Sequence, residues 1–259
     1  MIDIRRRCIR FSRETGTDEV PMVGGKNAAL GESHGTHDAT ARLERSEHRR
    51  TLQSISLPKP SARSNMSLAK ALQLRCTCRR IRSQPLSRRA LSDLLWAACG
   101  INRADGPFAQ PGRTAASASN SQEIDVYVLL PEGAYFYNAF AHALLPVAKG
   151  DLRPLALSSG QREARATACT QLVYVVDIDR LRNTRGYREP GLSQPEVQRS
   201  YYCVDVGLIA ANVYLHAAAN GLAAWFHNCD RRRLARKLRV TSDQRVLFAQ
   251  SVGYPRSRS

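Results

Sequence analysis

The segment 75–79, which reads Arg-Cys-Thr-Cys-Arg, is the clearest candidate for an anion site. Its polar residues Arg75, Thr77 and Arg79 alternate, so an extended backbone would present all three side chains on one side. Two guanidinium groups around a hydroxyl suit a phosphate monoester, and each charge-assisted hydrogen bond contributes about 1.5–3 kcal/mol. A solvated basic helix end is the alternative explanation of the segment on its own.

A second candidate is the run 117–122, which reads Ser-Ala-Ser-Asn-Ser-Gln and leads into a predicted strand. Asn120 and Gln122 stand two positions apart, so their amides would again lie on one side of an extended chain. Amide groups offer both donors and acceptors, the pattern needed to bind the edge of a planar heterocycle. The alternative is a Ser/Asn loop that caps the strand.

The histidines and cysteines do not form a metal-binding pattern, so we predict no metal site. His227 follows an aromatic pair and is either a proton donor to a reduced substrate or an ordinary packed histidine. Cys76 and Cys78 could be a redox dithiol, although a single spacer residue would strain the bridge. The odd count of seven cysteines favours reduced thiols in a cytoplasmic protein.

Apolar periodicity and capping residues predict the elements that would position these groups. The predicted helices are residues 68–74 after Ser67, the segment between Ser87 and Gly100, 137–148, 161–169, 198–220 with Gly221 as its left-handed C-cap, and 231–238 after Asp230. The predicted strands are residues 124–130, 172–177 and 245–252. Strands separated by long helices indicate an α/β or α+β sandwich.

The apolar run from Val204 to Phe226 approaches the length of a membrane span. It contains Asp205, Asn212 and His216, each costly in a bilayer, so we predict a buried core helix and no membrane association.

The formal net charge of +17 favours anionic partners, such as a phosphorylated cofactor, a nucleic acid or an acidic membrane surface. The charges are dense at residues 75–89 and 231–239. Arginine-rich codon usage with solvated helix faces would explain the same charge, because net charge reports on solubility and non-specific binding rather than on fold.

Residues 1–66 are predicted to be an N-terminal extension, largely disordered, with the folded domain spanning 67–259. Residues 33–66 contain few large apolar side chains and cannot offset their ordering entropy. Residues 18–32 resemble the opening of phosphoenolpyruvate synthase, in which Lys26 would face the ATP phosphates. The long domain of that family does not follow, so we expect no ATP chemistry. No apolar region follows the first arginines, which argues against an export signal.

From residue 67 to 255, an ordered set of short motifs resembles the nitroreductase family of flavoproteins. The motifs are the segment 75–79, the phrase Leu-Leu-Trp-Ala-Ala-Cys-Gly-Ile-Asn-Arg at 94–103, the loop 113–122, Asp205 with Gly207 and Asn212, Gly221-Leu222, and Val-Gly-Tyr-Pro at 252–255. No single motif is decisive, but their order along the chain is fairly specific.

This resemblance implies an α+β fold with a mixed β-sheet flanked by helices, in an interlocked homodimer that binds FMN at its interface. It implies hydride transfer from NAD(P)H through the flavin to nitroaromatic, quinone-like or related small-molecule acceptors, without a catalytic side chain. In the implied contacts with FMN, Arg75, Thr77 and Arg79 bind the phosphate, the ribityl chain and the pyrimidine end of the flavin, and Asn120 and Gln122 bind the ring. The backbone near His227 and Asn228 approaches the reactive N5 edge. Arg256 and Arg258 return to the phosphate.

Three departures from the family pattern bear on activity. Ala116 stands where the family has proline, Ser121 where a bulky residue is usual, and the region of Asn228 lacks a glycine. A non-catalytic flavin- or nucleotide-binding protein is therefore one alternative. A basic protein that associates with nucleic acid through residues 231–239 is another, less favoured one.

Overall fold

The computed structural model describes residues 52–61, 66–158, 160, 168–185 and 190–256. The stretch 18–32, most of the predicted helix 161–169 and the candidate ligand Arg258 lie outside these residues.

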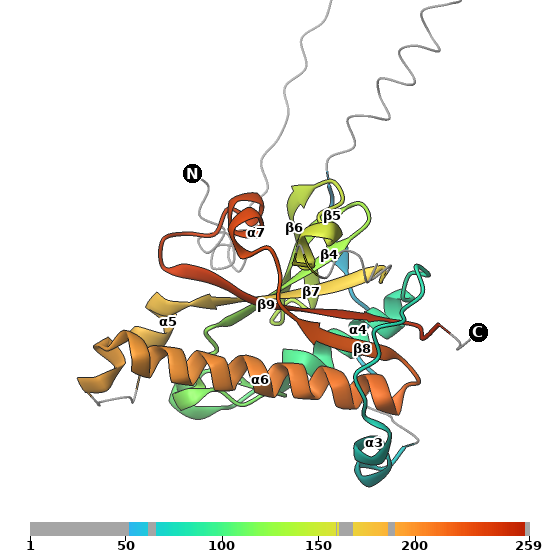
Figure 1. Cartoon of the computed structure of the whole chain (residues 1–259). Helices are drawn as coiled ribbons and strands as arrows, with labels where there is room; N and C mark the ends of the chain where they lie inside the picture. Colours follow the sequence, from blue (N-terminus) through green and yellow to red (C-terminus); the bar gives the residue numbers. More distant parts are fainter. Residues whose placement is uncertain (1–51, 62–65, 159, 161–167, 186–189, 257–259) are drawn as a thin grey trace, which may run out of the picture. The chain divides into compact units, whose positions relative to one another are not determined.

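A seven-stranded sheet in the order β1-β6-β5-β4-β7-β9-β8 organises the fold (Figure 1). Its strands are β1 (Ile55–Ser56), β4 (Ile124–Leu130), β5 (Gly133–Asn138), β6 (Ala143–Lys149), β7 (Thr170–Asp177), β8 (Ala223–His227) and β9 (Gln244–Gly253). A separate small sheet pairs β2 (Ile101–Arg103) with β3 (Gly112–Arg113). The three predicted strands correspond to β4, β7 and β9.

The helices are α3 (Leu68–Leu74), α4 (Arg88–Cys99), α5 (Ile178–Arg182), α6 (Pro195–Ala219) and α7 (Arg231–Leu238), with short 3-10 turns η1 (Pro107–Ala109), η2 (Ala118–Asn120), η3 (Arg153–Ala156) and η5 (Pro190–Ser193). The predicted caps are confirmed, because Ser67, Ser87 and Asp230 each accept a hydrogen bond from a backbone N–H in the first turn. Gly221 has φ +64°, the left-handed conformation predicted for it.

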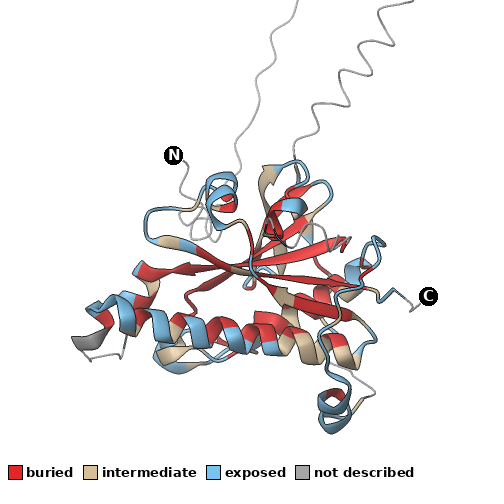
Figure 2. Cartoon of the chain, in the orientation of Figure 1, coloured by how far each residue is buried: buried red, intermediate tan, exposed pale blue. Residues whose placement is uncertain are grey.

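The sheet is covered on both faces, and its central strands are buried throughout (Figures 1 and 2). Val126 and Val128 of β4 join the core cluster that includes side chains of α4 and α6. Tyr127 and Leu129 point the other way, into the cluster that includes Leu234 of α7. This alternation follows from the two-residue period of a strand, and it places α6 and α7 on opposite faces of the sheet.

The predicted helix 137–148 is wrong, because these residues form the hairpin of β5 and β6. Tyr135 and Tyr137 face the core from β5, and Asn138 closes the turn by accepting hydrogen bonds from two backbone N–H groups with its side chain. Pro146, which has no N–H and would break the interior of a helix, argued against the prediction.

The sheet and the domain boundary also differ from expectation. The α+β class is confirmed, but every strand pairing among the described residues is antiparallel, so the sheet is not mixed. The folded unit begins before Ser67: β1 pairs with β6, Leu57 is buried, and Ser92 donates a hydrogen bond to the Pro58 carbonyl. Residues 52–61 therefore belong to this unit rather than to a disordered extension.

Helix α6 is long and apolar enough to cross a membrane by length and composition alone. Its residues Val206, Ile209 and Val213 are instead buried in the core cluster shared with α4. The predicted buried core helix is therefore confirmed for this face only, because Val204 and Leu208 on another side of the helix are exposed.

Candidate functional site

The segment 75–79, called the edge segment below, runs beside β8, the last strand of the sheet. The Cys78 N–H donates to the Ala224 carbonyl at 2.9 Å, which anchors the segment on the strand. Thr77 Oγ1 lies 3.2 Å from the Tyr214 hydroxyl of α6, and the Arg75 guanidinium lies 5.7 Å from the centre of the same ring. The Tyr214 hydroxyl also accepts the Phe226 N–H at 2.8 Å, so α6 and β8 together set the position of the segment.

Arg79 does not share the side on which Arg75 and Thr77 lie. Its guanidinium sits 5.5 Å from the centre of the Trp225 ring. Successive residues of a strand point to opposite faces, and Ala224 and Phe226 face the α6 side, so Trp225 points away from Tyr214. The predicted common side holds for Arg75 and Thr77 only.

The end of the described chain returns to the edge segment. The Arg256 N–H donates to the Arg80 carbonyl at 2.9 Å, and Pro255 bridges to Ile81. The backbone of Arg256 therefore lies next to the basic segment, and the contact of Arg256 with a phosphate stays a prediction. No ion pair to a carboxylate is found for Arg75, Arg79 or Arg256 among the described residues.

Residues 117–122, called the polar loop below, bind most of their polar groups internally. Asn120 Nδ2 donates to the carbonyls of Pro107 and Gln110, at 3.2 and 3.3 Å. Gln122 Nε2 donates to Asn120 Oδ1 at 2.9 Å and to the Pro111 carbonyl at 2.6 Å. The two predicted amides do lie together, but their hydrogen bonds shape the loop.

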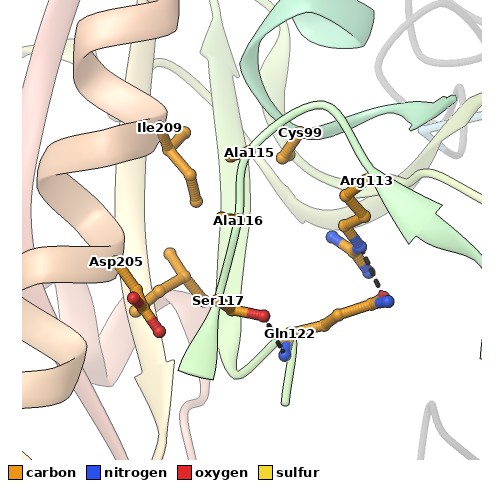
Figure 3. A pocket seen from close by; sticks show the side chains of 9 residues that line it. Cys99, Arg113, Ala115, Ala116, Ser117, Gln122, Asp205 and Ile209 are labelled. Carbon is orange, nitrogen blue, oxygen red and sulfur yellow. Dashed lines mark hydrogen bonds between the residues drawn. The ribbon is translucent and has the colours of Figure 1, made fainter. Parts of the chain in front are cut away.

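A small pocket opens between the polar loop and α6 (Figure 3). Arg113 and Gln122 line one side of it, where Arg113 Nε donates to Gln122 Oε1 at 2.6 Å, and Asp205 and Ile209 line the other side from α6. Cys99 also lines the pocket, and burial raises the pKa of its thiol to about 11. Such a thiol stays protonated near neutral pH and is a poor nucleophile.

Asp205 and Glu123 form a buried carboxyl pair next to this pocket. Asp205 Oδ2 accepts the Ala118 N–H of the polar loop at 3.1 Å, and Ser121 donates to Glu123 Oε2 at 2.5 Å. Burial and then the neighbouring Glu123 carboxyl raise the pKa of Asp205 to about 7. The sequence analysis did not assign this pair. Asp205 interrupts an apolar run, which is a signal of a buried acid, whereas Glu123 follows the polar residues of the loop and gives no such signal.

His227 is buried inside the sheet and does not offer a ring nitrogen to a ligand. Its Nε2 lies 2.8 Å from Ser251 Oγ, and its Nδ1 lies 2.9 Å from the Asn228 carbonyl. Burial lowers the pKa of this imidazole below its usual 6.5. Of the two interpretations of His227, the structure favours the ordinary packed histidine, because both ring nitrogens contact groups of the protein and the residue is part of β8. Asn228 is exposed, and its Oδ1 accepts a hydrogen bond from Arg231.

Within one chain, the polar loop and the edge segment contact α6 at different positions along the helix axis. The polar loop binds Asp205, whereas the edge segment binds Tyr214, nine positions further along the helix. At about 1.5 Å per residue this separation is about 13 Å along the axis. The described residues of a single chain therefore do not gather all the predicted ligands in one pocket.

These observations place the protein in the class of α+β proteins whose antiparallel sheet is flanked by helices, with a basic segment beside its edge strand. The nitroreductase family profile matches residues 72–254, and the chain belongs to the nitroreductase family, whose members are oxidoreductases.

Two relatives carry the nitroreductase name. MJ1384 of Methanocaldococcus jannaschii is 29% identical over 147 residues, which are 54% of this chain and 67% of that protein. A crystal structure from Ralstonia eutropha JMP134 is also 29% identical, with a TM-score of 0.68, and the match covers 92% of this chain and 100% of the other. A chain of the E. coli microcin synthetase McbBCD complex is 19% identical with a TM-score of 0.56 over 88% of this chain and 85% of its own, which shows a shared fold alone.

Proposed function

We propose that this protein is an FMN-dependent oxidoreductase that transfers hydride from NAD(P)H to nitroaromatic, quinone-like or related acceptors. The observation that carries the proposal is the edge segment, where the exposed Arg75 guanidinium and the Thr77 hydroxyl meet at Tyr214 of α6 in a nitroreductase-family chain. Bound FMN would supply the hydride chemistry, and the protein would supply placement and electrostatics.

The donor groups at the edge segment fit a phosphate. Arg75, Arg79 and Arg256 are exposed, and none of them is paired with a carboxylate among the described residues. Arg75 and Thr77 would bind the phosphate together, with Arg256 beside them. An anion at this place would be stabilised by charge-assisted hydrogen bonds to groups that already lie on aromatic rings.

The polar loop would contribute through its shape. Asn120 Oδ1 accepts one hydrogen bond and has a second lone pair available for a ring N–H, while the Gln122 side chain holds the loop closed. Excluding water and fixing the loop would be its contribution to the site.

A homodimer would bring the two groups together. Helix α6 has a second apolar face, along Val204, Leu208, Ala211 and Leu215, and the first two are 60% and 41% exposed. Leu68 and Leu72 of the neighbouring α3 are also exposed. Exposed apolar side chains in such a row favour a protein interface. If a second copy covers this face, the polar loop of one subunit would approach the edge segment of the other. The described cysteines are free thiols, which supports a reducing, cytoplasmic location.

The visible spectrum of the purified protein, recorded with and without NADH or NADPH, tests the proposal. We expect a yellow protein with flavin absorbance that is bleached by one of the two donors and restored by an acceptor. A colourless protein that does not take up added FMN would reject the proposal. A yellow protein that neither donor bleaches would indicate the non-catalytic flavin-binding alternative.

A further inference from the structure

Two carboxyl groups meet beneath the polar loop with few donors to satisfy them. Glu123, just before β4, is fully buried, and Asp205 of α6 is 4% exposed. Burial, followed by the charge of Glu123 and a side-chain hydrogen bond with it, raises the pKa of Asp205 to about 7, so the two carboxyl groups act on each other directly. Two ionised carboxylates at this separation and depth would repel each other strongly.

One oxygen of the carboxyl pair accepts no hydrogen bond from the described residues. Ser121 donates to Glu123 Oε2, and the Ala118 N–H donates to Asp205 Oδ2. Glu123 Oε1 is buried and receives no hydrogen bond from the described residues. A buried acceptor without a donor is costly, and a proton on Asp205 directed at Glu123 would remove that cost.

The surrounding charges do not neutralise the pair. Arg113 of β3 directs its Nε to Gln122. Arg180 of α5 binds Asp125, Asp177 and the Gln122 carbonyl. The remaining titratable group of the pocket is the thiol of Cys99 in α4, which stays protonated near neutral pH. No guanidinium among the described residues is therefore hydrogen-bonded to Glu123 or Asp205.

We propose that Asp205 and Glu123 share one proton, and that this proton holds the polar loop in the shape that presents Asn120. The loop requires such a hold, because Ser119, Asn120 and Gln122 have positive φ angles of 47°, 55° and 51°. Asp205 anchors it through Ala118, the residue just before the strained pair. Loss of the proton places two negative charges side by side and weakens this anchor. Asp205 is thus a positioning residue, and its importance for flavin binding rests on the proposed function.

The first test compares the pH dependence of unfolding in the wild type and in Asp205→Asn. The asparagine amide reproduces the protonated acid, since Oδ1 accepts the Ala118 N–H and Nδ2 donates to Glu123. Between about pH 5 and 7 the folded wild type holds a proton that the unfolded chain has released. The wild-type unfolding constant, divided by that of the variant, should therefore rise about tenfold per pH unit and level off above about pH 7.

Asp105→Asn, at an exposed position, is the matched control and should leave this ratio constant with pH. A constant ratio for Asp205→Asn as well would overturn the proposal. If that variant does not fold, the wild type alone gives an answer by infrared spectroscopy. A protonated-carboxyl stretch that is present at about pH 6 should vanish at about pH 8.5. Its absence at both values would also overturn the shared proton.

FMN titration at the same two pH values separates this inference from the proposed function. The FMN phosphate gains charge over the same range in both proteins, so the affinity of the wild type is compared with that of Asp205→Asn at each pH. We expect the ratio of wild-type to variant affinity to fall at the higher pH. Flavin binding with the same pH dependence in both proteins, together with a constant unfolding ratio, rejects the shared proton and leaves the proposed function intact. A rising unfolding ratio in a protein that binds no flavin supports the shared proton and rejects the proposed function.

Discussion

The edge segment and the polar loop hold their polar groups in opposite ways. Arg75 and Arg79 are exposed and lie on the rings of Tyr214 and Trp225, without a carboxylate partner among the described residues. Asn120 and Gln122 are tied to loop carbonyls and to each other. Polar side chains that could all bind a ligand therefore have different roles in the two regions. The arginines of the edge segment are available to a partner, whereas the amides of the polar loop fix the shape of the loop.

Disruption of the proposed dimer should have the largest effect on flavin binding, because the dimer decides whether the two regions form one site. Val204→Glu with Leu208→Glu would place two charges in the proposed interface, at a cost of several kcal/mol each. We expect a monomer by analytical ultracentrifugation and a loss of flavin, although both regions are unchanged. Phe140→Glu, also an exposed apolar position, is the control and should remain dimeric. A monomer that retains its flavin would show that one chain makes the whole site.

The next effect concerns the edge segment alone. Arg75→Ala with Arg79→Ala removes one charge-assisted contact with the phosphate, at Arg75, and a second cation near it, at Arg79. The contact contributes about 1.5–3 kcal/mol, so FMN affinity should fall at least about 10- to 10²-fold. Stability should change little, because both side chains are exposed. Isothermal titration and urea unfolding measure the two quantities.

Arg232→Ala with Arg236→Ala on α7 removes the same charge from another surface and should leave FMN affinity unchanged. Equal losses in both double variants would mean that net charge, rather than the edge segment, attracts the cofactor. A loss of salt-dependent RNA or DNA affinity confined to the α7 variant would support the nucleic-acid alternative.

For the polar loop the main effect should be on stability. Gln122→Ala removes the hydrogen bonds to Arg113, Pro111 and Asn120 and leaves these half-buried partners unsatisfied, which should lower the free energy of unfolding by about 1–3 kcal/mol. Gln110→Ala, at an exposed position in the same region, should change it by less than about 0.5 kcal/mol. Equal stabilities by urea unfolding would contradict the internal role of the Gln122 amide.

The smallest effect is a pH dependence opposite to that of Asp205. Because the folded pKa of His227 lies below 6.5, the unfolded state binds a proton that the folded state resists. Stability present above pH 6.5 is therefore lost as the pH falls toward the folded pKa, by at most about 1.4 kcal/mol per pH unit. His227→Gln should flatten this acid limb in urea unfolding, and an unchanged slope would show that other groups cause it.

Local signals were enough to predict much of the fold. A serine or aspartate that caps a helix acts on N–H groups within its own first turn, so Ser67, Ser87 and Asp230 could be assigned without the structure. The strand 124–130 followed from alternation in the same way. The hairpin of β5 and β6 was missed because Ala, Leu and aromatic residues suit both helix and strand, and pairing with β4 decides between them.

The candidate site likewise has some features that could be predicted from the sequence and others that could not. The chemistry of residues 75–79 could be read from residue types, and the ordered motifs identified the nitroreductase family. The direction in which Arg79 points could not be predicted from the sequence, because it depends on the Trp225 ring, which lies far along the chain. The burial of His227 likewise depends on Ser251, a partner on the neighbouring strand.

By itself, the sequence determined where the capped helices α3, α4 and α7 begin, which strands form the centre of the sheet, and which residues carry charge. Only the tertiary structure decided which polar groups are committed to the protein's own backbone and that Glu123 meets Asp205. The physical reason is range: capping and alternation act within a few residues, whereas burial and the sharing of a proton depend on groups that folding brings together from distant positions.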